Sequence, residues 1–125
     1  MVTILLAEDD KNFGIILKKE LEEDKCTTVD LVSDGVEAVE RFIENTYDFV
    51  LLDIKLPKLD GTNALKVIKK LNPDIPAITF SGHAGNVEMA ESIEAGAIKC
   101  LTKPFEIAVL KEEVKRYIML RRRCQ

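Results

Sequence analysis

The stretch from Val50 to Gly61 reads VLLDIKLPKLDG, and its apolar run ends in the single carboxylate of Asp53. Buried strands favour apolar side chains, and a carboxylate is seldom buried unless it has a partner. Asp53 therefore needs a chemical explanation as well as a structural one. An aspartate side chain can act as a nucleophile and form an aspartyl phosphate.

Polar residues also follow other apolar runs of the chain. They are Glu8-Asp9-Asp10, Ser81-Gly82-His83 and Thr102-Lys103-Pro104, whereas Ser33-Asp34-Gly35 is typical of a helix start. If the runs are parallel strands, their carboxyl ends meet at one edge of a sheet, where open α/β sheets bind ligands. Converging carboxylates repel one another, and a divalent cation relieves the repulsion. Oxygen ligands without a His or Cys set favour Mg²⁺ over zinc.

This set of side chains predicts phosphoryl transfer onto Asp53. A metal ion and the ammonium of Lys103 would neutralise the oxygens of the phosphoryl group. The hydroxyl of Ser81 would donate to one of these oxygens, and Gly82 would leave room for the group. On this hypothesis Asp53 must remain within reach of a phosphodonor.

Two patterns alternate along the chain and predict the elements that hold these residues. Short apolar runs at 2–7, 27–33, 47–53, 76–81 and 97–102 predict strands. Apolar residues at helical spacing predict helices between and after them. The predicted buried sets are Phe13, Ile16, Leu17 and Leu21; Val36, Val39 and Ile43; Leu65, Ile68 and Leu71; Val87, Ala90 and Ile93; and Leu110, Val114, Tyr117 and Ile118. The order predicts an α/β fold, a doubly wound (βα)5 sandwich with a central five-stranded parallel sheet.

Composition limits the alternatives. The chain has 125 residues, 46% of them hydrophobic and 32% charged, which suits one soluble domain. Its net charge of −4 argues against direct nucleic-acid binding. The absence of a signal-type leader and of an apolar run near about 20 residues predicts a cytoplasmic protein without membrane contact. Cys26, Cys100 and Cys124 lack metal-ligand spacing and are expected to be free thiols.

Four segments in this order carry a family resemblance: ILLAEDD (4–10), VLLDIKLPKLDG (50–61), ITFSGH (78–83) and CLTKPF (100–105). With them the whole chain resembles the receiver domain of bacterial two-component response regulators, of the chemotaxis-regulator type. The resemblance implies one flavodoxin-like receiver domain over residues 1–125. It also implies a regulatory phospho-acceptor rather than an enzyme, with only intrinsic self-phosphorylation and autodephosphorylation.

The resemblance also implies the roles of the acidic residues. Asp53 matches the phospho-acceptor, and Glu8 and Asp9 match the acidic pair that holds Mg²⁺, with Asp9 the more direct ligand. Asp53 itself and the backbone carbonyl of Lys55 complete the protein's ligands. Asp10 is then left for the N-terminus of the next helix.

The remaining matches concern the phosphoryl group and the switch. Ser81 matches the hydroxyl and Lys103 the lysine that meet the phosphoryl group, and Pro104 implies a cis peptide bond after Lys103. Lys55 and His83 occupy positions that flank the group in the family. Cys100 departs from the pattern, because many receivers have an aromatic switch residue there.

The resemblance implies a sensor histidine kinase, a phosphotransfer protein or a small acyl phosphate as donor, and a downstream output domain or protein as target. Three other functions fit the sequence less well. A metal-dependent phosphatase would need a second acid near Asp53, where Lys55 stands instead. A nucleotide-binding protein would need a phosphate loop in place of the acidic run. A docking module without chemistry would not need Asp53, Ser81 and Lys103.

Overall fold

The computed structural model describes residues 1–82 and 86–123, and it confirms the predicted alternation of strands and helices. The strands are β1 (Val2–Ala7), β2 (Thr27–Val32), β3 (Phe49–Asp53), β4 (Ala77–Ser81) and β5 (Lys99–Thr102). The helices are α1 (Lys11–Leu21), α2 (Gly35–Glu44), α3 (Gly61–Leu71), α4 (Asn86–Glu94) and α5 (Ile107–Arg123). No helix in these two described stretches is long and apolar enough to cross a membrane.

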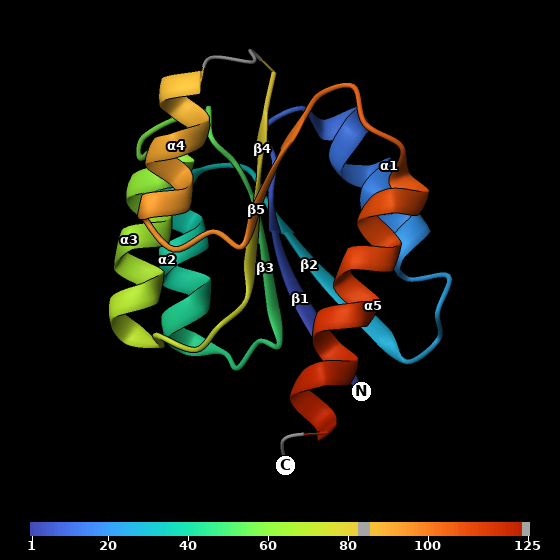
Figure 1. The fold of residues 1–125 in the computed structure, drawn as a ribbon. Coiled ribbons are helices and arrows are strands. Elements are labelled where there is room, and N and C mark those ends of the chain that lie inside the picture. The colour runs from blue at the N-terminus through green and yellow to red at the C-terminus, as the bar shows by residue number, and fades with distance from the viewer. Residues whose placement is uncertain (83–85, 124–125) are drawn as a thin grey trace.

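The five strands form one parallel sheet in the order β2-β1-β3-β4-β5. Helices α2, α3 and α4 cover one face, and α1 and α5 cover the other (Figure 1). This is the flavodoxin-like doubly wound sandwich that the sequence predicted. Strand β2 lies on one side of β1, and strands β3, β4 and β5 follow on the other side. The carboxyl ends of the neighbouring strands β1 and β3 therefore form the switch point at which such folds bind ligands.

Each face of the sheet has its own hydrophobic core, and β3 contributes to both. Val50 and Leu52 lie in the core under α2 and α3, whereas Phe49 and Leu51 lie in the core under α1 and α5. All five residues of β3 are buried. The strand must therefore be apolar on both sides, which explains why its sequence shows no polar alternation before Asp53.

Aspartate side chains start the first three helices and fix the loops at the carboxyl edge. Asp10, Asp34 and Asp60 are N-caps whose side chains accept from the backbone N–H three residues on. Asp60 and Gly61 thus form the start of α3. Gly61 is required there, because a Cβ atom on it would lie 2.0 Å from the carbonyl oxygen of Asp53.

The predicted buried face of α2 is wrong. Val36 and Ile43 are 40% and 64% exposed, and the helix instead buries Ala38 and Phe42. Apolar residues occur on two sides of this helix, so spacing alone did not choose between them. The ring of Phe42 stacks on Tyr47 with centroids 6.1 Å apart, a contact between neighbouring segments that favours this rotation.

Other members of the predicted buried sets are exposed as well, namely Ile16, Leu71, Val87, Ala90 and Ile93. In α1, α3 and α5 the remaining apolar positions are enough to pack the helix on the sheet, since Leu17, Leu65, Ile68 and Leu110 are completely buried. Helix α4 is different, because every residue of its predicted set is exposed.

Substitution of Phe42 and of its neighbour Ile43 tests this rotation of α2. Phe42→Ala should lower the free energy of unfolding by about 3 kcal/mol, because it leaves a cavity beside Tyr47. Ile43→Ala should change it by less than about 0.5 kcal/mol, because that side chain lies in solvent. Urea unfolding of both variants measures the difference, and a larger loss for Ile43→Ala would contradict the assignment.

Candidate functional site

Three carboxylates gather at the carboxyl edge of the sheet. One oxygen each of Glu8, Asp9 and Asp53 lies within 4.8 Å of the others. Glu8 and Asp9 directly follow β1, and Asp53 ends β3, which is hydrogen-bonded to β1. Glu8 and Asp53 are 2% and 5% exposed, whereas Asp9 is exposed. The cluster is therefore buried on the protein side and open on the side of Asp9.

The ammonium group of Lys103 joins two of these carboxylates. Its Nζ lies 2.7 Å from Oδ2 of Asp53 and 2.5 Å from Oε1 of Glu8. The backbone N–H of Lys103 donates to the carbonyl of Ser81, and the Lys103–Pro104 peptide bond is cis, as the resemblance implied. The loop after β5 thus directs this side chain toward β1 and β3.

Lys103 contacts an aromatic cluster that the sequence did not predict. The ammonium group lies 4.8 Å from the ring centroid of Phe13 in α1, within the range of a cation–π interaction. Phe105 packs between this ring and that of Phe80, with centroids 5.7 and 5.1 Å away. The signal in the sequence was the place of Phe105, directly after Lys103 and Pro104.

The electrostatics of the cluster are set by burial and by the mutual repulsion of the acids. Burial and the hydrogen-bonded neighbour Asp53 raise the pKa of Glu8 to about 7, although Lys103 acts in the opposite direction. Burial by itself would lower the pKa of Lys103, but its hydrogen bonds to Asp53 and Glu8 outweigh burial and raise that pKa. Lys103 therefore stays charged and Glu8 is poised between its two protonation states near neutral pH.

Backbone groups in the loop after β3 also hold the carboxylate of Asp53. The backbone N–H of Lys55 donates to Oδ1 of Asp53 at 3.1 Å, while the N–H of Ile54 donates to the carbonyl of Phe80. The N–H of Gly61 closes the loop onto the carbonyl of Ile54 at 2.7 Å. The two oxygens of Asp53 therefore have separate donors, a backbone amide for one and Lys103 for the other.

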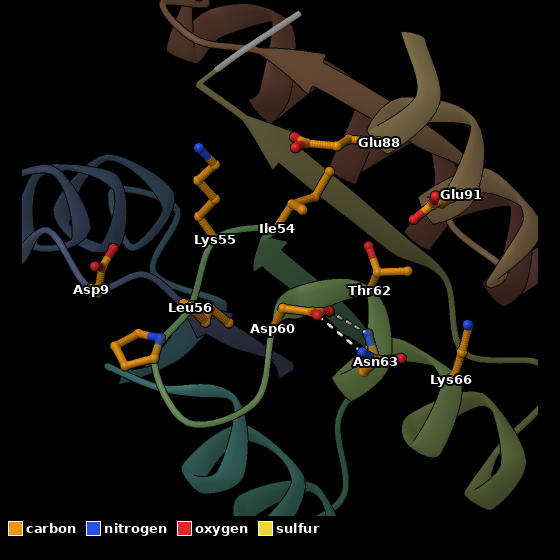
Figure 2. A pocket seen from close by; sticks show the side chains of 11 residues that line it. Asp9, Ile54, Lys55, Leu56, Asp60, Thr62, Asn63, Lys66, Glu88 and Glu91 are labelled. Carbon is orange, nitrogen blue, oxygen red and sulfur yellow. Dashed lines mark hydrogen bonds between the residues drawn. The ribbon is translucent and has the colours of Figure 1, made fainter. Parts of the chain in front are cut away.

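A groove of about 520 Å³ leads along this loop toward α4. Asp9 and the exposed side chain of Lys55 stand on one side of it, and Glu88 and Glu91 of α4 on the other (Figure 2). Thr62, Asn63 and Lys66 come from α3 and form part of the lining. The groove meets the acidic cluster at Asp9.

The remaining predicted residues lie near this cluster, elsewhere in the fold, or outside the described part of the chain. Ser81 ends β4 one residue beyond the partner of Asp53 in the sheet and is 2% exposed. Cys100 lies partly buried on β5 and Cys26 is exposed, and both are free thiols. His83 and Cys124 lie outside the described residues.

The residues of the cluster fit a magnesium ion. They offer carboxylate oxygens, which this hard cation prefers, and Asp9 leaves one side open for the water molecules that Mg²⁺ retains. Among the described residues, one ammonium group contacts this set of three acids. A divalent cation would compensate the remaining negative charge.

Comparisons with known proteins agree with this geometry. A sequence model described as "Response regulator receiver domain" matches residues 4–115. "Response regulator ArlR" of Staphylococcus saprophyticus is 32% identical over 125 residues, which is 100% of this chain and 55% of that protein. The chain spans about half the length of several curated relatives that it matches.

Two solved structures show the same fold. A CheY-like receiver domain protein from Methanospirillum hungatei superimposes with a TM-score of 0.90 at 26% identity, covering 100% of this chain and 99% of that one. The receiver domain of sensor histidine kinase PA1611 from Pseudomonas aeruginosa superimposes with a TM-score of 0.83 at 30% identity, covering 94% and 97%. That structure is described with a magnesium ion coordinated in its active-site cleft.

The fold and the acidic edge define a phospho-accepting signalling domain of two-component systems. The chain belongs to the response regulator receiver domain family. The family is a regulatory one that binds Mg²⁺ in its acidic pocket and interacts with histidine kinases, phosphotransfer proteins and output domains.

The raised pKa of Glu8 makes its contribution to stability depend on pH. Below pH 4.5 both the folded and the unfolded chain hold the proton, and the group has no effect. Between pH 4.5 and about 7 the unfolded chain loses the proton first, so folding becomes less favourable as the pH rises. In metal-free buffer at pH 8, Glu8→Gln should therefore stabilise the fold by about 3 kcal/mol.

Urea unfolding with a chelator at pH 5 and pH 8 measures this effect, and the exposed Glu40→Gln serves as the control. Near pH 5 the Glu8→Gln variant and the native chain should be almost equally stable. Added Mg²⁺ should stabilise the native chain more than the variant, because the variant has lost one acidic ligand. An equal loss of stability in the variant at both pH values would contradict the prediction.

Proposed function

We propose that Asp53 is the residue that accepts the phosphoryl group in this receiver domain. The observation that carries the proposal is the placing of its carboxylate between Lys103 and two further acids at the open edge of the sheet. Asp53 ends a strand that is otherwise apolar on both faces, so packing alone gives no reason for an acid there.

The reaction is an in-line transfer from a phosphorylated histidine or a small acyl phosphate. One oxygen of Asp53 attacks the phosphorus, and a P–O bond forms as the bond from phosphorus to the donor breaks. The bonding electrons return to the leaving group, which is the imidazole nitrogen or the carboxylate of the donor. The imidazole takes up a proton from water, and the carboxylate leaves as the anion.

The side chains around Asp53 prepare it for this reaction. Glu8, Asp9, Asp53 and the backbone carbonyl of Lys55 would hold Mg²⁺, which would supply positive charge for the phosphoryl oxygens. Lys103 moves no proton and acts as a fixed cation beside the attacking carboxylate. The hydroxyl of Ser81 donates to the transferred group once it is bound.

The domain works as a switch rather than as an enzyme with turnover. Its own chemistry is limited to self-phosphorylation from small donors and intrinsic hydrolysis of the product. We propose that residues 1–125 form one receiver domain, that it acts in the cytoplasm, and that it receives its phosphoryl group from a sensor histidine kinase or a phosphotransfer protein. Its target is an output domain or a separate protein, without direct nucleic-acid or membrane binding by this domain.

Labelling with a small acyl phosphate tests the acceptor. In the presence of Mg²⁺ the intact mass of the native chain should rise by one phosphoryl group, and a chelator should prevent the gain. Asp53→Asn should abolish labelling, because an amide is not a nucleophile of this kind. The exposed Asp74→Asn is the matched control and should be labelled like the native chain.

Labelling of Asp53→Asn at the native rate would show that another residue is the acceptor. Absence of labelling in the native chain, both with an acyl phosphate and with a phosphorylated histidine protein, would favour a docking module without chemistry.

Replacement of Lys103 tests its role as a fixed cation. Lys103→Met keeps a long apolar side chain over Phe13 but removes the charge, so metal-dependent labelling should slow by about 100-fold. Lys99→Met is the control, because Lys99 lies on β5, just before the loop that carries Lys103, and forms an exposed ion pair with Glu113. Rates come from the time course of the intact mass, and similar rates for both variants would contradict this role.

A further inference from the structure

Helix α4 is attached to the sheet in a way that differs from the other helices. Helices α1, α2, α3 and α5 each bury leucine, isoleucine or phenylalanine side chains against it. In the described part of α4 the only buried side chain is that of Ser92, which is completely inaccessible. Val87 and Ile93 are 69% and 46% exposed. The hydrophobic effect therefore holds this helix more weakly than the others.

The surface of the sheet under α4 is made of small and polar side chains. Side chains alternate between the two faces of a strand, and Ala77 of β4 belongs to the core on the α2 and α3 side. Thr79 and Ser81 therefore face the same side as Ala77, whereas Ile78 and Phe80 belong to the opposite core. On β5, Thr79 and Ser81 pair with Cys100 and Thr102. No large apolar side chain is available on these positions to anchor the helix.

A buried pair of hydroxyl groups makes the attachment instead. Oγ1 of Thr79 lies 2.9 Å from Oγ of Ser92, and neither residue is accessible to solvent. The Ser92 hydroxyl donates its one proton to the carbonyl of Met89 at 2.9 Å. Thr79 must then be the donor to Ser92, so the two bonds form a directed chain from β4 into α4.

The docked position of α4 also leaves a polar atom unsatisfied. Oε2 of Glu88 is buried and has no hydrogen-bond partner among the residues that the structure describes. Figure 2 shows this carboxylate directed from α4 toward Ile54, across the groove from Lys55. A buried acceptor without a partner opposes docking, so α4 is held by a small balance of favourable and unfavourable contacts.

We propose that the Thr79–Ser92 hydroxyl pair is the latch that holds α4 on the sheet, and that phosphorylation reaches α4 through it. The second half rests on the proposed function of Asp53 and Ser81. Thr79 lies two residues before Ser81 on the same strand and the same face, so a shift of Ser81 toward a phosphoryl group also displaces Thr79. The latch thus takes the place of the aromatic switch that Cys100 cannot provide.

Hydrogen exchange of α4 in the unphosphorylated chain tests the first half. Thr79→Val and Ser92→Ala should each speed exchange of the α4 amides by about fivefold, because each leaves one buried hydroxyl without its partner. The double variant should exchange more slowly than the two single effects combined, since neither hydroxyl then remains. Thr79→Ser keeps the hydroxyl and should behave like the native chain, as should the exposed Thr46→Val control.

Exchange in the presence of Mg²⁺ and an acyl phosphate tests the second half. Phosphorylation of the native chain should change α4 exchange several-fold, and in the double variant the change should fall below about twofold. The gain in intact mass should persist in the double variant, because neither residue contacts the acidic cluster. A purely structural role would alter the basal exchange and leave the response to phosphorylation intact.

Native exchange rates in both single variants would overturn the latch. An undiminished response to phosphorylation in the double variant would overturn the proposal that phosphorylation reaches α4 through it. If the native chain gains no mass, the proposed function fails, and exchange in the unphosphorylated variants still decides whether the pair holds α4.

Discussion

The bond of one ammonium group to two carboxylates is the interaction on which the site depends. Lys103 contacts Glu8 and Asp53, which come from neighbouring strands, and without this cation two buried acids would face each other directly. The strand order, the cis bond before Pro104 and the ring of Phe13 all help to place that one nitrogen atom. Much of the carboxyl edge of the sheet is therefore organised around a single positive charge.

This arrangement costs stability, which contacts in the rest of the fold offset. Acids kept close together in a partly buried place oppose folding when no metal ion neutralises them. The two hydrophobic cores offset this loss, since the strands between them are buried on both faces. The aspartate N-caps contribute as well, because they satisfy backbone groups at the same edge without adding to the acidic cluster.

Local signals predicted much of the fold and the residues of the site, whereas the choice between competing side-chain contacts did not follow from the sequence. The strand ends at Asp53 and Ser81 and the cap at Asp10 depend on neighbouring residues, so they could be predicted from the sequence. The rotation of α2 depends on whether Phe42 or Ile43 meets Tyr47, and helical spacing fitted either side. The Thr79–Ser92 bond joins residues 13 positions apart, and nothing in the pattern distinguishes these hydroxyls from those of surface residues.

The partition of the sheet into two faces separates the two ends of a signal. The side chain of Asp53 points to the same face of the sheet as Leu51, toward α1 and α5. The side chains of Ser81 and Thr79 point to the other face, toward α4. A protein that approaches over α1 and one that grips α4 would stand on opposite sides of the molecule (Figure 1). The two contact surfaces need not overlap, so the phosphoryl donor and the target protein could bind at the same time in one ternary complex.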